Sequence, residues 1–147
     1  MIEAITEDKI CIDLECNDWE DCIRKCAQPL LDNESININY IDSIIETCKE
    51  VGPYIVISKS IALSHSRPEN GVYKNDLAIA KLKKPIYFGS KGNDPVRIVI
   101  TLSALDNEVH LELLSVLSDI LSDNNVVNSL IASKTKSEFI SIIENSI

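Results

Sequence analysis

Several features that mark special classes of protein are scarce or missing in this 147-residue sequence. The four glycines and five prolines stand singly, and there is no repeat, linker or low-complexity stretch, so we expect disorder only at the chain ends. No apolar run approaches the roughly 20 residues that a membrane-spanning helix needs. Nothing near the N-terminus resembles a cleavable signal segment. We therefore expect one domain over residues 1–147, soluble, cytoplasmic and not inserted in a membrane.

Positive charge is also in short supply. Lysine and arginine total 14 against 23 aspartates and glutamates, which gives a formal net charge of -9 at pH 7. Affinity for nucleic acid comes mainly from lysine and arginine side chains that neutralise phosphates, so we do not expect nucleic acid as a partner. An acidic surface is better suited to a basic protein partner.

The five cysteines include no C-x-x-C pair, and their number is odd, which indicates a reducing cytoplasm rather than a disulfide framework. Cys22 and Cys26 lie four residues apart on a helical pattern, the spacing of a conceivable metal site. Neither His65 nor His110 shows ligand-type spacing with them. We therefore interpret the cysteines as small buried apolar residues and expect neither a metal nor a cofactor.

The apolar pattern of the sequence predicts an α/β protein. Strands are expected at residues 9–14, 55–57, 61–63, 77–80 and 96–102, of which the last two form the centre of the sheet. Helices are expected from Asn17 or Asp18 through Leu30 with a kink at Pro29, from about Asn39 to Gly52, from Asp106 through Ile120, and from a capping box at Thr135 to the C-terminus. This order favours a sheet with helices on both faces.

His65 stands directly after one of the short predicted strands and before a turn, in the sequence IALSHSRPENG. The end of a strand is a position where a rigid scaffold presents reactive side chains. A neutral imidazole nitrogen is a nucleophile at cytoplasmic pH, and a backbone carbonyl can hold the other ring nitrogen and fix the tautomer. His65 is thus a candidate for covalent catalysis, although an ordinary surface histidine fits the same pattern.

Two further residues could act with His65. Arg67 is on the same turn, and a guanidinium matches the oxygens of a phosphoryl group, although a solvated arginine is an equal alternative. His110 falls in the first turn of a predicted helix, where free backbone N–H groups favour an anion. It precedes Leu113 and Leu117 at helical spacing, so a place at the edge of the core is the other interpretation.

Four segments together resemble the enzyme IIA components of the sugar phosphotransferase system, of the mannitol/fructose class. They are GPYIVISKSIALSHSRPENGV (52–72), DLAIAKLKKPIYFG (76–89), NDPVRIVITLSALDNEVHLELLSVLSDIL (93–121) and the closing helix from Thr135. They occur in the order and spacing of that family, over nearly the whole chain. The HxRPE turn preceded by GPY is most similar to the ascorbate-type branch.

The resemblance implies a mixed five-stranded sheet flanked by helices and a cytoplasmic phosphocarrier. His65 would accept a phosphoryl group from phosphorylated HPr and pass it to a cysteine of enzyme IIB, and His110 would help to bind that group. The sugar itself would be recognised by the membrane permease, enzyme IIC, and would never touch this chain. Phosphoryl transfer of this kind needs mainly in-line positioning and charge compensation, which we assign to Arg67, His110 and the backbone near Asn107.

The sequence also departs from the family. Ser64 and Ser66 flank the histidine where proline and a small residue are common, which predicts either a looser backbone or additional hydroxyl hydrogen bonds. Lys49 replaces an arginine sixteen residues before His65, so Arg67 is expected to supply most of the positive charge. Two other functions are compatible with the sequence: a regulatory IIA-like protein that signals its phosphorylation state by binding other proteins, and an α/β interaction domain without chemistry.

Overall fold

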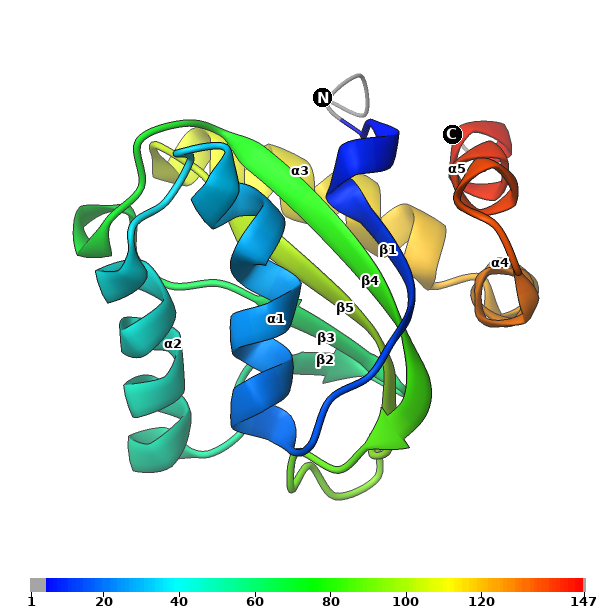
Figure 1. The fold of residues 1–147 in the computed structure, drawn as a ribbon, viewed down its shortest axis with the longest axis horizontal. Helices are drawn as coiled ribbons and strands as arrows, with labels where there is room; N and C mark the ends of the chain where they lie inside the picture. The colour runs from blue at the N-terminus through cyan, green and yellow to red at the C-terminus, as the bar shows by residue number, and fades with distance from the viewer. Residues whose placement is uncertain (1–4, 147) are drawn as a thin grey trace.

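The computed structural model describes residues 5–146 and contains a five-stranded mixed sheet with helices on both faces, which confirms the predicted fold (Figure 1). The strands, in their order across the sheet, are β1 (Ile10–Leu14), β4 (Asp76–Ile86), β5 (Val96–Ser103), β3 (Ile61–Ser64) and β2 (Val56–Ser58). The β1–β4 and β3–β5 pairs are parallel, and the other two pairs are antiparallel. The two strands predicted at the centre, β4 and β5, lie there.

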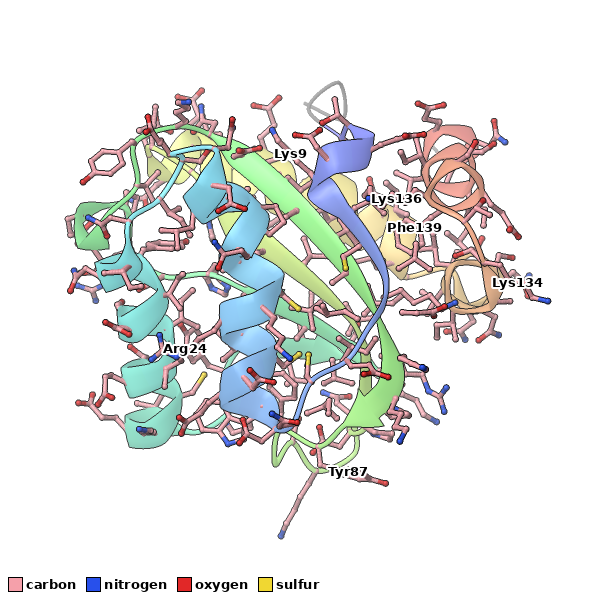
Figure 2. All side chains as sticks on the ribbon, in the orientation of Figure 1. Lys9, Arg24, Tyr87, Lys134, Lys136 and Phe139 are labelled. Atoms are coloured by element: carbon pink, nitrogen blue, oxygen red, sulfur yellow. The ribbon has the colours of Figure 1, made fainter. Side chains whose placement is uncertain are left out.

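The helices divide between the two faces of the sheet. In Figure 1, α1 (Trp19–Asp32) and α2 (Ile38–Val51) lie in front of it, and α3 (Asn107–Leu121) lies behind. The shorter helices α4 (Asn124–Ala132) and α5 (Lys136–Asn145) complete the second layer, where the side chain of Phe139 is fully buried (Figure 2). Successive strand residues point to opposite faces. Because both faces are covered, every residue of β5 except Arg97 is buried.

A side-chain oxygen caps the N-terminus of each long helix. The side chain of Asp18 accepts a hydrogen bond from the backbone N–H of Asp21. In the same way Asn37 accepts from the N–H of Tyr40, and Asp106 accepts from the N–H of Val109. Thr135 caps α5, but Glu138 accepts from the N–H of Lys134 and so does not complete the predicted capping box. A cap of this kind stabilises a protein by about 1 kcal/mol, and these four caps explain why the helices begin close to the predicted positions.

Three local features differ from the sequence prediction. The helix α1 ends at Asp32, two residues beyond the predicted Leu30. The strand β4 extends beyond the predicted 77–80, because its outer half is polar yet still pairs with β1 and β5. The sequence pattern did not predict α4, a nine-residue helix that begins with two asparagines and buries only Val127 and Leu130. Its apolar face is too short to give a periodic signal.

The parallel pairing of β3 with β5 positions the candidate site. In this register Ser64 lies beside Thr101, so both strands end at the same edge of the sheet. The turn that contains His65 therefore meets the segment that leads into α3, at the left in Figure 1. Among residues 5–146, no helix combines the length and apolar character required to cross a bilayer.

Candidate functional site

His65 follows β3 directly and lines a cavity of about 280 Å³, here called the His65 cavity. Its Nδ1 lies 2.7 Å from the carbonyl oxygen of Leu63. A carbonyl oxygen only accepts hydrogen bonds, so this contact assigns the ring proton to Nδ1 and leaves the lone pair on Nε2. The side chain is half-buried and its free nitrogen is the one a phosphorus atom could approach.

Tyr54 holds the backbone of His65 from the other side. Its hydroxyl donates to the carbonyl oxygen of His65 at 2.5 Å, and its ring meets the imidazole edge-on, with centroids 5.4 Å apart and planes at 76°. Burial raises the pKa of Tyr54, so the hydroxyl remains a donor. No role of Tyr54 was predicted from the sequence, although it belongs to the GPY segment. An aromatic residue directly after the Gly52–Pro53 helix stop was the available signal.

His110 comes to the same cavity from the first turn of α3. Its ring centroid is 5.2 Å from that of His65, with the planes inclined at 47°. Its backbone N–H donates to the carbonyl of Asp106, the N-cap residue. Burial lowers the pKa of His110, and the neighbouring imidazole of His65 lowers it further. His110 is therefore a neutral hydrogen-bonding group at pH 7.

Arg67 is exposed on the turn after His65 and lines the same cavity. No carboxylate of residues 5–146 forms a salt bridge with it. Lys49 lies elsewhere: its Nζ is 3.6 Å from Glu20 and 3.7 Å from Glu46, and it does not line the cavity. Of the two cations considered from the sequence, Arg67 is the one at the His65 cavity.

Ser66 attaches the turn to α2 and to the sheet. Its backbone N–H donates to the hydroxyl of Tyr40 at 3.0 Å, and that hydroxyl donates to the carbonyl of Leu102 at 2.7 Å. The Ser66 hydroxyl contacts that of Ser43, and the Asn70 amide donates to both hydroxyls. Burial raises the pKa of Tyr40 to about 12, so the phenol keeps its proton.

Of the two serines that flank His65, only Ser66 thus adds hydroxyl hydrogen bonds. The hydroxyl of Ser64 is buried and has no hydrogen-bond partner among residues 5–146. The two serines predicted either a looser backbone or additional hydroxyl hydrogen bonds. At Ser66 the additional hydrogen bonds are present, because Tyr40 and Ser43, the α2 residues that bond to it, lie three residues apart on one face of the helix.

Most of the residues that line the His65 cavity have a polar group in the side chain. The lining residues are Thr47, Tyr54, His65, Ser66, Arg67, Pro68, Asn70, Asn107 and His110. The first backbone N–H groups of α3 have no intrahelical partner and favour an anion. A nucleophilic nitrogen, a guanidinium and a neutral imidazole therefore surround a space that fits a tetrahedral anion. No group of three or more His, Cys, Asp or Glu residues in the described part of the chain is arranged to hold a metal ion.

A known family model matches almost the whole chain. Residues 3–146 match the family model described as Phosphoenolpyruvate-dependent sugar phosphotransferase system, EIIA 2. The chain belongs to this family. It is therefore an EIIA component of the sugar phosphotransferase system, a phosphotransfer protein, and the family inferred from the sequence motifs is confirmed.

Individual EIIA proteins are similar over almost their whole length. The ascorbate-specific EIIA component of Shigella boydii is 31% identical, with 97% of this chain and 94% of the relative covered. The solution structure of the mannitol-specific cryptic enzyme IIA of Escherichia coli has a TM-score of 0.88 at 27% identity, with 97% of each chain covered. The E. coli mannitol enzyme IIA solved in complex with phosphorylated enzyme IIB has a TM-score of 0.84 at 21% identity, covering 96% and 97%, which shows a shared fold.

Proposed function

We propose that this EIIA protein carries a phosphoryl group on Nε2 of His65 in the cytoplasm. It receives the group from phosphorylated HPr and passes it to a cysteine of enzyme IIB, which serves an enzyme IIC permease in the uptake of ascorbate or a related sugar. In the first step a bond forms between phosphorus and Nε2 while the phosphorus–nitrogen bond of the donor breaks. In the second, the IIB thiolate takes the phosphoryl group and Nε2 regains its lone pair.

One observation carries this proposal: the hydrogen bond between Nδ1 of His65 and the carbonyl of Leu63. Because β3 holds that carbonyl in the sheet, the ring has a fixed tautomer before any partner arrives. A positioned nucleophile avoids much of the entropic cost of a reaction between two molecules. The bond from Tyr54 to the backbone of His65 supports the same orientation.

The negative charge of the phosphoryl group is compensated by Arg67, on the turn after His65, and by groups at the start of α3. Arg67 is free to bind two phosphoryl oxygens, since no carboxylate of the described chain competes for it. His110 donates a ring N–H without adding a full charge, because its pKa is lowered. The first N–H groups of α3 contribute in the same direction. These roles need neither a metal nor a nucleotide.

The two partners are macromolecules, and the site is accessible to them. Leu105 and Leu111, on either side of the start of α3, are 50% and 65% exposed. Exposed apolar side chains beside a small open cavity are suited to transient contact with another protein. The fold shared with the mannitol enzyme IIA that was solved with phosphorylated IIB supports IIB as the acceptor.

The direct test is incubation with enzyme I, HPr and phosphoenolpyruvate, followed by mass spectrometry under conditions that preserve phosphohistidine. We expect one phosphoryl group, on the peptide that contains His65, and its loss when IIB is added. His65→Gln should remain unlabelled, and His110→Gln should still be labelled. Labelling of the His65→Gln protein, or a phosphoryl group on His110 in the wild type, would refute the assignment.

A further inference from the structure

A second cavity, of about 450 Å³, lies at the opposite end of strands β3 and β5 from His65. Lys59 and Ser60, in the turn between β2 and β3, line it together with Arg97, the second residue of β5. Asn124 and Asn128 of α4 form the facing wall. We call this the Arg97 cavity; Figure 1 shows α4 on the right, away from the start of α3.

The three arginines of the chain suggest what this cavity does. Arg24 pairs with Asp42 at 3.0 Å and joins α1 to α2 (Figure 2). Neither Arg67 nor Arg97 forms a salt bridge with a carboxylate of residues 5–146, and each lines a cavity. Lys59 is also without a salt bridge within that range. In a chain with a net charge of -9, two uncompensated cations around one cavity form a local site for an anion.

The remaining polar groups of the cavity can take part in the same contact. The backbone of Ser60 is already used, since its N–H donates to Asn93 and its carbonyl accepts from Arg97 and Ile98, which leaves the hydroxyl. The nearest carboxylate in sequence, that of Asp123, caps α4 by accepting from the N–H of Asn125 and does not line the cavity.

The rest of the wall is apolar and contains no nucleophile suited to transfer. Val127 and Ile131 line it one helical turn apart. No histidine or cysteine lines the cavity, and its lysine is exposed. The chemistry therefore supports reversible binding, with a charged end of the ligand on Arg97 and Lys59 and a short apolar part on α4.

We propose that the Arg97 cavity binds a small organic anion through a phosphate or carboxylate group, at a site separate from the phosphoryl-transfer site. Nothing in the proposed phosphocarrier function requires this cavity. The proposal rests on two cations without carboxylate partners, on their convergence with amide and hydroxyl groups, and on a cavity larger than the one at His65.

The test is an NMR titration of the ¹⁵N-labelled full chain with citrate, and separately with inorganic phosphate, against sodium chloride at equal ionic strength. We expect saturable shifts in the amide signals of Asn124–Asn128 and of Ser60. Arg97→Gln and Lys59→Gln should each weaken binding by roughly tenfold, because each removes a charge-assisted contact. Arg24→Gln, which removes an arginine that already has a carboxylate partner, is the matched control and should bind as the wild type does.

Shifts that equal those caused by chloride, or that persist unchanged in the Arg97→Gln protein, would overturn the proposal. Shifts with citrate alone would identify a carboxylate ligand, and shifts with phosphate alone a phosphate ligand. Inorganic phosphate should also shift signals around His110, and Arg67→Gln should abolish only those. Labelling of His65 by phosphorylated HPr is measured independently, so either result can fail while the other holds.

Discussion

The two ends of strands β3 and β5 present similar charges and different chemistry. At one end Arg67 and the first turn of α3 border the His65 cavity, and at the other Arg97 and the first turn of α4 border a larger one. Only the first end has imidazoles, with their centroids 5.2 Å apart. Positive groups are enough to bind an anion, whereas transfer also needs a nucleophile with a fixed free lone pair.

The difference originates in how the turns are fixed. The backbone groups of Ser60 bond to Asn93, Arg97 and Ile98, which leaves its hydroxyl for a ligand. The turn at His65 is held by Tyr54 and Tyr40, two phenols whose pKa values are raised by burial. Both phenols remain protonated donors, so the reactive ring sits on a backbone that does not have to be ordered when a partner binds.

The largest effect of removing a charge should come from Arg67→Gln. We expect the rate of phosphoryl transfer from phosphorylated HPr to fall by roughly 10²-fold, since a preorganised donor to the transferring oxygens is lost. Arg97→Gln is the comparison and should change the rate by less than about twofold, because screening removes most of an effect between distant exposed charges. Single-turnover labelling in a rapid-quench instrument measures both. Equal losses would remove the distinction between the two ends.

His110→Gln should have the next largest effect, a loss of roughly tenfold in transfer rate, the equivalent of one neutral hydrogen bond. The protein should remain folded, because His110 is half-buried at the wall of the His65 cavity and belongs to neither buried apolar cluster. Circular dichroism serves as the control for folding. An unchanged rate would mean that the second imidazole is near the phosphoryl group without binding it.

The same residue predicts a pH dependence of stability. The folded pKa of His110 is below its ordinary value, so the unfolded chain binds a proton more readily than the folded protein. Above pH 6.5 both states are neutral and nothing is lost. As the pH falls through that value towards the folded pKa, this histidine destabilises the fold. The melting temperature should therefore drop less between pH 7.5 and 5.5 in His110→Gln than in the wild type.

The sequence predicted the elements that carry long periodic or continuous apolar patterns. The sheet centre at β4 and β5 and the caps at Asp18, Asp106 and Thr135 follow from local chemistry that a single segment contains. The helix α4 was missed because nine residues with only two buried side chains give no periodicity. Tertiary packing against α3 and α5 stabilises it, and no local signal reports that contact.

The candidate site could be predicted only in part, because contacts made across the fold leave no signal in the sequence. His65, Arg67 and His110 were found because their residue types and sequence context suggest chemistry. Tyr54 and Tyr40 were not, since their importance depends on which carbonyl or N–H each hydroxyl reaches across the fold. The positions of the cations also required coordinates, because the sequence does not show that Lys49 pairs with Glu20 and Glu46 or that Arg67 lines the His65 cavity.

Tyr54→Phe should have a smaller effect than the charge and imidazole changes. It removes the hydrogen bond to the carbonyl of His65 and keeps the aromatic ring, so we expect a loss of roughly threefold in transfer rate, less than a typical hydrogen bond, because water can reach the half-buried carbonyl. Tyr54 acts as a positioning residue. The ¹⁵N shifts of the His65 ring should therefore move towards a mixture of tautomers, which a purely structural role would not cause.

Lys49→Gln should have the smallest effect of all, within about twofold of the wild type. Lys49 pairs with Glu20 and Glu46 on the surface, where such pairs contribute about 0–1 kcal/mol to stability, and the loss is smaller at high salt. The change leaves two carboxylates uncompensated but adds no charge inside the His65 cavity. Comparison of Lys49→Gln with Arg67→Gln in the same labelling assay shows whether the position of a positive charge or the net charge of the protein controls the transfer rate. If both substitutions slowed transfer equally, the net charge of the whole protein would govern the rate. The position of Arg67 at the His65 cavity would then not distinguish this end of the sheet from the other.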